Sequence, residues 1–168
     1  MAEWKIQHLT KDHDRSAFSS GNASLDKFIR TLASQYEKRR LGRTYVATDG
    51  DSTAVVGYYT LAMGSIALSD LAAEVRKKLP QHPIPSLHLG RLAVDQSSQG
   101  QRLGEELLFH ALRKALASSE EAGAYAVDVW AIDEKAKSFY EKYGFVSLAD
   151  NSLHLYVLIT SVEAMFAP

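Results

Sequence analysis

The stretch 86–116 constrains the fold of this chain more than any other, because its pattern predicts a strand, a loop and a long helix in succession. The strand is expected over Leu87–Val94 and the polar, glycine-containing loop over Asp95–Gln101. An amphipathic helix follows, since apolar residues recur at helical spacing from Leu103 to Leu116. Backbone N–H groups at such a junction converge on one point, and the helix macrodipole favours an anion there. The segment therefore predicts either a phosphate-binding loop or a plain structural turn.

The loop has a pattern in common with a known family. Gln99-Gly100-Gln101-Arg102-Leu103-Gly104 resembles the pyrophosphate loop of the GNAT N-acetyltransferases, Arg/Gln-x-x-Gly-x-Gly/Ala, although Arg102 stands where that family usually has glycine. The resemblance implies that backbone amides here hold the pyrophosphate of acetyl-CoA. An arginine is compatible with this if its side chain points outward, and its guanidinium could add a phosphate contact. A side chain that crowds the loop would instead weaken binding. The residues implied in acetyl-CoA binding are Leu92, Ala93, Val94, Gln99, Gly100, Gln101, Arg102, Leu103 and Gly104.

A second motif lies downstream. A strand is expected over Tyr125–Trp130 and a short helix over Glu134–Lys142, and the string from Ala136 to Phe145 resembles the GNAT signature in which Phe-Tyr precedes Gly-Phe. The resemblance implies that Tyr140 is the catalytic residue, a general acid for the departing CoA thiolate. A lone tyrosine on an apolar helical face is otherwise a buried aromatic with a satisfied hydroxyl.

Composition excludes several classes of protein. The chain has 168 residues, 46% of them hydrophobic and 23% charged, which suits one folded domain over 1–168 and argues against disorder. There is no cysteine, so disulfides, thiolate catalysis and cysteine-type zinc sites are excluded. The histidines show no metal-ligand spacing, and we expect no metal and structural roles for His88 and His154. No apolar run suggests a signal peptide or a membrane span, so the expected compartment is the cytoplasm.

The first half of the chain contributes two basic clusters. Residues 3–9 suggest an edge strand, and an amphipathic helix is expected from Leu25 to Tyr36, capped by Asn22 or Ser24 and stopped by Gly42. Strands are expected over Arg43–Thr48 and Ala54–Leu68, joined as a hairpin, with a helix over Ser69–Leu79. The net charge of −1 does not indicate nucleic acid, so any RNA contact needs a local patch. The candidate tRNA-binding residues are Lys38, Arg39, Arg40 and Arg43, joined by Lys77 and Lys78. Cations at a helix C-terminus also serve simply to complement the macrodipole.

This order of elements predicts an α/β (α+β) domain with a mixed, mainly antiparallel sheet flanked by helices. A last strand is expected over Leu153–Ile159. The strands at Leu87–Val94 and Tyr125–Trp130 are joined through a helix, so they should be parallel. In the GNAT fold the corresponding pair splays apart to admit the cofactor.

The resemblance extends over roughly Phe18 to Phe145. Phe18–Asp26, the Pro83-Ile84-Pro85 lead and Leu89–Asp95 resemble the GNAT-type toxins of toxin–antitoxin pairs, the TacT and AtaT kind. That likeness implies acetylation of the α-amino group of charged tRNA and a block in translation. It also implies an antitoxin with a ribbon-helix-helix DNA-binding part, and a homodimer.

The chemistry agrees with the residues present. A free α-amino group has a pKa near 8, so a neutral fraction exists without a strong base, and backbone N–H groups near Ala93 and Val94 are candidate oxyanion donors. Tyrosine, with a reference pKa near 10, can protonate the thiolate. Two alternatives stay open: a GNAT enzyme for a small-molecule or protein amine, and a non-catalytic acyl-CoA-binding or antitoxin-binding module in which Arg102 has spoiled the loop.

Overall fold

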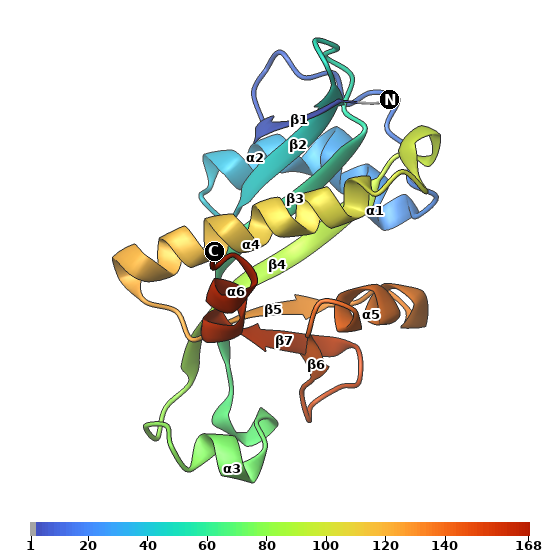
Figure 1. Ribbon diagram of the computed structural model, residues 1–168. Helices are drawn as coiled ribbons and strands as arrows, with labels where there is room; N and C mark the ends of the chain where they lie inside the picture. The colour runs from blue at the N-terminus through green and yellow to red at the C-terminus, as the bar shows by residue number, and fades with distance from the viewer. Residues whose placement is uncertain (1–2) are drawn as a thin grey trace. The chain divides into compact units, whose positions relative to one another are not determined.

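The computed structural model describes residues 3–168 and divides into two compact units (Figure 1). Among the described residues, the first comprises those up to Ala62 together with Gly90–Ala111, and the second Met63–Leu89 and Leu112–Pro168. The strands form a seven-stranded sheet in the order β1-β2-β3-β4-β5-β7-β6. Their bounds are β1 Trp4–His8, β2 Arg43–Asp49, β3 Gly57–Ile66, β4 Ile84–Val94, β5 Ala126–Trp130, β6 Val146–Ser147 and β7 His154–Leu158. The α-helices are α1 Ala23–Lys27, α2 Ala33–Lys38, α3 Ala73–Arg76, α4 Leu103–Ala122, α5 Glu134–Glu141 and α6 Ile159–Met165.

The first unit is built on an antiparallel meander. β1 pairs with β2 from Trp4↔Asp49 to His8↔Tyr45, and β2 pairs with β3 from Arg43↔Leu61 to Ala47↔Gly57. The predicted edge strand and the hairpin are therefore confirmed. The hairpin loop is longer than expected, because Ala54 leaves the ladder to form a bridge with Asp14.

The predicted first helix is interrupted by a π-helical segment. Asn22 caps α1 through its side-chain oxygen, which accepts from the N–H of Leu25 at 3.0 Å. Five residues of π-helix, Phe28–Leu32, then separate α1 from α2. The predicted stop at Gly42 is wrong: Arg40 takes the left-handed conformation, with φ of +58°, and the N–H of Leu41 returns to the carbonyl of Tyr36.

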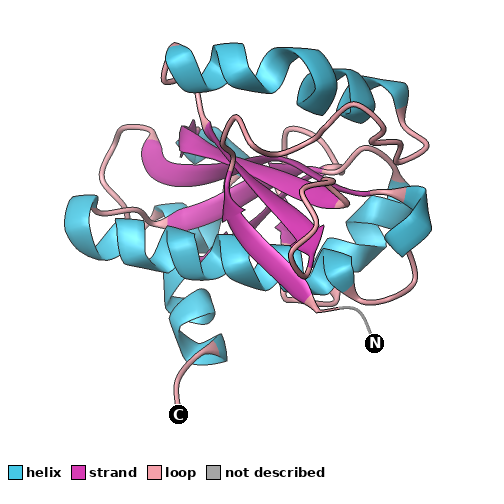
Figure 2. Ribbon diagram, turned by 90° about the horizontal axis from the view of Figure 1, so that it is seen from above, coloured by secondary structure: helices cyan, strands magenta, loops and turns pink. Residues whose placement is uncertain are grey.

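Within the first unit, helices lie on both faces of the strands (Figure 2). Two neighbouring side chains of β3 show which helix covers which face. The Tyr58 hydroxyl donates to the carbonyl of Leu25 in α1 at 2.6 Å, whereas the next side chain, Tyr59, shares a 2.7 Å hydrogen bond with His110 of α4. Because successive side chains of a strand point to opposite faces, α1 and the N-terminal half of α4 cover opposite sides of this sheet.

The second unit contains the parallel pair. β4 and β5 run parallel from Ser86↔Ala126 to Leu89↔Val129, β5 and β7 antiparallel, and β6 and β7 antiparallel. The predicted mixed sheet with one parallel pair is confirmed. In the core, Ile66, Leu71, Ile84, Ala126 and Leu148 are all buried.

In the second unit one helix prediction was inaccurate, and one helix was not predicted. The expected helix over Ser69–Leu79 is reduced to a 3₁₀ turn at Leu68–Asp70 and one turn of α3, because Ala72 at its N-cap offers no side-chain acceptor. The final strand ends at Leu158, and α6 follows from Ile159, which sequence patterning missed. The β-branched residues there suggest a strand, but burial of Val162 holds the segment as a helix.

Candidate acetyl-CoA site and catalytic tyrosine

The loop between β4 and α4 is fixed at both ends by its own polar side chains. Asp95 accepts from the N–H of Ser19 at 2.8 Å through Oδ1 and from the N–H of Ser97 at 3.0 Å through Oδ2. Gln99 donates from Nε2 to the carbonyls of Ser20 and Val94, both at 2.9 Å. The Gln99 side chain therefore closes the loop, which leaves its backbone as the part that can face a ligand.

Two residues of the loop adopt the left-handed conformation. Gly100 has φ of +79° and Arg102 has φ of +69°, immediately before the first residue of α4. A non-glycine residue in this region is strained by about 1–2 kcal/mol. The Arg102 side chain is 82% exposed, with its guanidinium 3.8 Å from Glu105, so it points outward and does not fill the loop.

The N-terminus of α4 is anchored firmly below that loop. Leu103 and Leu107 are buried against β3, where a Cβ on Gly57 would lie only 3.0 Å from each of them. The first-turn amides of a helix have no intrahelical acceptor, and α4 is 20 residues long, so its macrodipole is fully developed. Gly100–Gly104 thus present backbone N–H groups and a positive helix end, which fits a pyrophosphate.

The strand that precedes the loop places the other predicted cofactor residues in the same unit. Ala93 is buried, and Leu92 and Val94 are half-buried at the end of β4. The N–H of Asp95 donates to the carbonyl of Val56 at 2.8 Å, which fixes this strand end. All nine predicted acetyl-CoA residues thus belong to one continuous stretch of the first unit.

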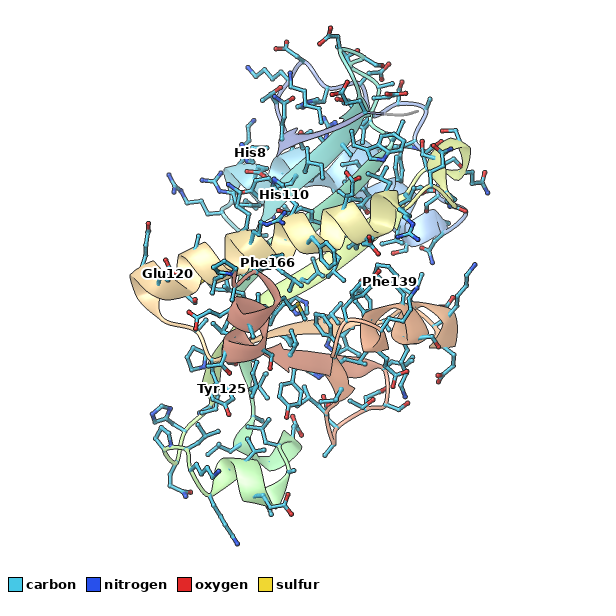
Figure 3. All side chains as sticks on the ribbon, viewed as in Figure 1. His8, His110, Glu120, Tyr125, Phe139 and Phe166 are labelled. Atoms are coloured by element: carbon cyan, nitrogen blue, oxygen red, sulfur yellow. The ribbon has the colours of Figure 1, made fainter. Side chains whose placement is uncertain are left out.

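Tyr140 lies in the second unit on α5, the helix that carries the labelled Phe139 in Figure 3. Asp133 caps this helix by accepting from the N–H of Ala136 at 2.8 Å. Tyr140 is 5% exposed and packs against the rings of Phe139 and Phe145. Burial raises the pKa of its hydroxyl above the usual value of 10, so the group is protonated at neutral pH, as a proton donor must be.

A buried polar cluster in the second unit escaped sequence analysis. Asp128 on β5 bonds through Oδ2 to Nδ1 of His88 at 2.9 Å and to Nε2 of His154 at 2.8 Å, and its Oδ1 accepts from Ser86 Oγ at 2.8 Å. His154 also bonds to Asp150 at 2.8 Å and stacks on Trp130. Both histidines thus hold a buried carboxylate in place. The available signal was an aspartate inside an otherwise apolar strand.

The basic residues fall into separate groups. Lys38, Arg39 and Arg40 are exposed at the end of α2, whereas Arg43 forms an ion pair with Glu37 at 2.9 Å. Glu37 also bonds to His8 at 3.0 Å, so Arg43 belongs to a local network. Lys77 and Lys78 are exposed but lie in the second unit, as a cluster of their own.

Within residues 3–168 no cluster of histidine or acidic side chains could hold a metal ion. None of the helices in that range is long and apolar enough to cross a membrane.

Comparison with known proteins identifies the family. The acetyltransferase (GNAT) domain family matches residues 40–147. A tRNA-acetylating toxin of Mycobacterium tuberculosis is 36% identical over 160 residues, which cover 95% of this chain and 94% of that protein.

Solved structures agree. AtaT complexed with acetyl-methionyl-tRNAfMet superposes with a TM-score of 0.91 at 32% identity, covering 98% of this chain and 100% of that one. A tyrosine-to-phenylalanine variant of AtaT, bound to the C-terminus of the antitoxin AtaR and acetyl-CoA, gives a TM-score of 0.82 at 30% identity, covering 98% of each chain. The fold is the GNAT fold, and the chain belongs to the GNAT acetyltransferase family, which uses acetyl-CoA and needs no metal.

Proposed function

We propose that this protein is a toxin that transfers acetyl from acetyl-CoA to the α-amino group of an aminoacyl-tRNA and thereby blocks translation. The observation that carries the acetyl-CoA half is the loop geometry: Gly100 and Arg102 are left-handed, and Arg102 is turned outward at the N-terminus of α4. The relatives named above, which are tRNA-acetylating or bound to acetylated tRNA, support the acceptor. The outward side chain argues against the non-catalytic alternative.

The reaction needs two proton movements, and the chain has a candidate group for one of them. The α-amine attacks the thioester in its neutral form, which its pKa near 8 makes accessible. A C–N bond forms, the C–S bond breaks, the nitrogen gives up one proton to solvent, and the sulfur leaves as a thiolate that must gain a proton. We propose Tyr140 as the donor, because burial keeps its hydroxyl protonated and α5 holds it rigidly. The backbone N–H groups of Ala93 and Val94 are the proposed donors to the developing oxyanion.

Recognition of the RNA is proposed to begin at the end of α2. Lys38, Arg39 and Arg40 are exposed and bear three positive charges that no described carboxylate within residues 3–168 pairs with at ion-pair distance. Arg43 contributes less, since Glu37 neutralises it. Lys77 and Lys78 are proposed as a secondary contact from the second unit.

Further parts of the proposal concern assembly. The family match spans residues of both units, which supports a single functional domain over 1–168. The AtaT complex with AtaR supports an antitoxin partner, for which we propose a ribbon-helix-helix protein, and we propose a homodimer. A tRNA substrate supports the proposed cytoplasmic location.

The direct test is acetyl transfer from labelled acetyl-CoA to a pool of charged tRNA, with deacylated tRNA as the control. Label on the charged pool alone is expected. Label on a polyamine or protein, with none on charged tRNA, would instead favour the small-molecule or protein amine.

A further inference from the structure

Arg91 is a partly buried cation on β4 whose surroundings are aromatic. Its guanidinium lies 3.7 Å from the ring centroid of Phe28 and 5.3 Å from that of Tyr36. Within residues 3–168 no carboxylate lies at ion-pair distance from it. Asp26, the buried acid of the same layer, accepts instead from the N–H and hydroxyl of Ser20 at 2.8 and 2.6 Å. The charge of Arg91 is thus left without an anion.

The two rings that contact Arg91 come from one helical segment, residues 28–38. Phe28 opens the π-helical segment and Tyr36 lies in α2, so one ring comes from the irregular turn and the other from the helix that follows it. Single π-helical turns are frequent at functional sites. Arg15 donates to the carbonyl of Ile29 at 3.2 Å, which helps satisfy the backbone of that turn. Stacking on aromatic faces holds a guanidinium flat while leaving its in-plane N–H donors available.

The position of Arg91 favours an acceptor substrate over the cofactor. Phe28 packs with Tyr58, on the sheet face that α1 covers, whereas Tyr59 points to α4 on the opposite face. Arg91 therefore lies on the α1–α2 side, whereas the N-terminal half of α4 covers the other face and the anion loop is tied to Ser19 and Ser20, ahead of α1. Tyr36 is also close in sequence to the exposed cations Lys38, Arg39 and Arg40.

We propose that Arg91 is an RNA-contacting residue: its stacked guanidinium binds a backbone phosphate of the acceptor RNA and extends the cationic surface formed by Lys38, Arg39 and Arg40. A planar fork of N–H donors suits bidentate recognition of a phosphate. The inference rests on the proposed function, because it requires RNA to be the acceptor.

The test compares Arg91→Met with the wild-type protein. Methionine preserves much of the packing volume and removes the charge. We expect tRNA affinity to fall about tenfold at low salt, and the slope of log affinity against log salt to fall by roughly 0.7–0.9, as for one lost phosphate contact. The KM for charged tRNA should rise while acetyl-CoA affinity stays unchanged. Arg91→Lys, which keeps the charge without the planar fork, should lie between the two.

A matched control is available in Arg113, whose guanidinium lies 4.6 Å from the ring centroid of Phe166, labelled in Figure 3, in the second unit. Arg113→Met removes one stacked charge in the same way and should leave the salt slope unchanged. An equal loss in both variants would reduce the effect to net charge and overturn the inference.

Three other results would also overturn it. If the wild-type protein binds tRNA and Arg91→Met has the same salt slope, the stacking of Arg91 serves only packing. The proposed function would then still hold. Weaker binding of acetyl-CoA but not of dephospho-CoA would assign Arg91 to the cofactor's 3′-phosphate. Failure of the wild-type protein to bind tRNA at all would overturn the proposed function together with the inference.

Discussion

Asp128 and His154 are joined by a 2.8 Å hydrogen bond between Oδ2 and Nε2 in the interior of the second unit. Burial alone would raise the pKa of Asp128, but hydrogen bonds from His88 and His154 outweigh it, so its pKa lies below 3.8. Burial alone would lower the pKa of His154, but its bonds to Asp128 and Asp150 outweigh that, so its pKa lies above 6.5. The pair thus favours a charged histidine beside a charged aspartate.

This pair predicts a pH-dependent contribution to stability. The contribution of Asp128 to the free energy of unfolding is present above pH 3.8 and is lost as the pH falls through its lowered pKa. The contribution of His154 to the free energy of unfolding is fully present below pH 6.5 and is lost as the pH rises through its raised pKa. His154→Gln should therefore cost about 3 kcal/mol of unfolding free energy near pH 5, and less towards either side. Urea denaturation across this pH range measures it. Exposed His82→Gln is the control, and a cost in His154→Gln that does not vary with pH would contradict the account.

Replacing Tyr140 by phenylalanine should abolish most acetyl transfer. The ring stays in its buried site against Phe139 and Phe145, so the fold and acetyl-CoA affinity should be retained. Loss of a general acid lowers kcat by about 10²–10⁴-fold. Steady-state kinetics with charged tRNA, with acetyl-CoA calorimetry alongside, separates chemistry from binding. Tyr143→Phe, in the turn that follows α5, should keep full kcat. Tyr140→Phe would keep it as well if the general-acid role were wrong.

Gly64 should not tolerate a methyl group. A Cβ at this position would lie 3.0 Å from Ser86 Oγ and 3.1 Å from the Cβ of His88, inside the Asp128 cluster. Gly64→Ala should destabilise the protein by about 1–3 kcal/mol. At Gly42 the nearest atom would be 3.5 Å away, so Gly42→Ala is the matched control. Thermal denaturation of both variants measures the difference. Equal stability of the two would contradict the predicted steric clash at residue 64.

Arg102→Gly should relieve the strained loop without harming cofactor binding. Glycine removes about 1–2 kcal/mol of left-handed strain but adds about 0.5–1 kcal/mol of chain entropy in the unfolded state. Stability should therefore stay level or rise by up to about 1.5 kcal/mol, with acetyl-CoA affinity preserved. Arg102→Val, β-branched at positive φ, should weaken both. Calorimetry with acetyl-CoA checks this, and loss of binding in Arg102→Gly would show that the guanidinium itself contacts the cofactor.

The basic end of α2 should be needed for RNA but not for acetyl-CoA. Arg39→Glu/Arg40→Glu should weaken tRNA binding by tenfold or more at low salt, because two phosphate-facing charges are reversed. Lys5→Glu/Lys11→Glu changes the net charge equally at exposed positions of the same unit. Filter binding of tRNA over a salt series distinguishes the pairs. Equal weakening in both would mean a non-specific effect of net charge.

Local patterns predicted the parts of the fold that local physics decides. Apolar spacing located α4, the Asp-Gly turn indicated the hairpin, and β4 and β5 were correctly expected to be parallel. The π-helical segment and α6 were missed, because tertiary packing and not propensity holds them. The left-handed conformation of Arg40 was not predicted either, because arginine has no particular preference for a positive φ.

The site divides in the same way. Motif spacing predicted a cofactor loop from Gln99 to Gly104 and a catalytic tyrosine, and both stay predictions. The Asp128 cluster could not be predicted, because its members come from three strands that only the sheet order brings together. Arg91 was not predicted as a binding residue, because the two rings that its guanidinium stacks on come from a helical segment far away in the sequence.

The measurement that tests the central claim most directly is mass spectrometry of the aminoacyl-adenosine released by nuclease from charged tRNA after reaction with acetyl-CoA. The account predicts one acetyl group on the α-amine of the amino acid, absent from deacylated tRNA and from the Tyr140→Phe reaction. Acetylation of the nucleoside itself, or unmodified aminoacyl-adenosine from an enzyme that binds acetyl-CoA and acetylates other amines, would contradict it.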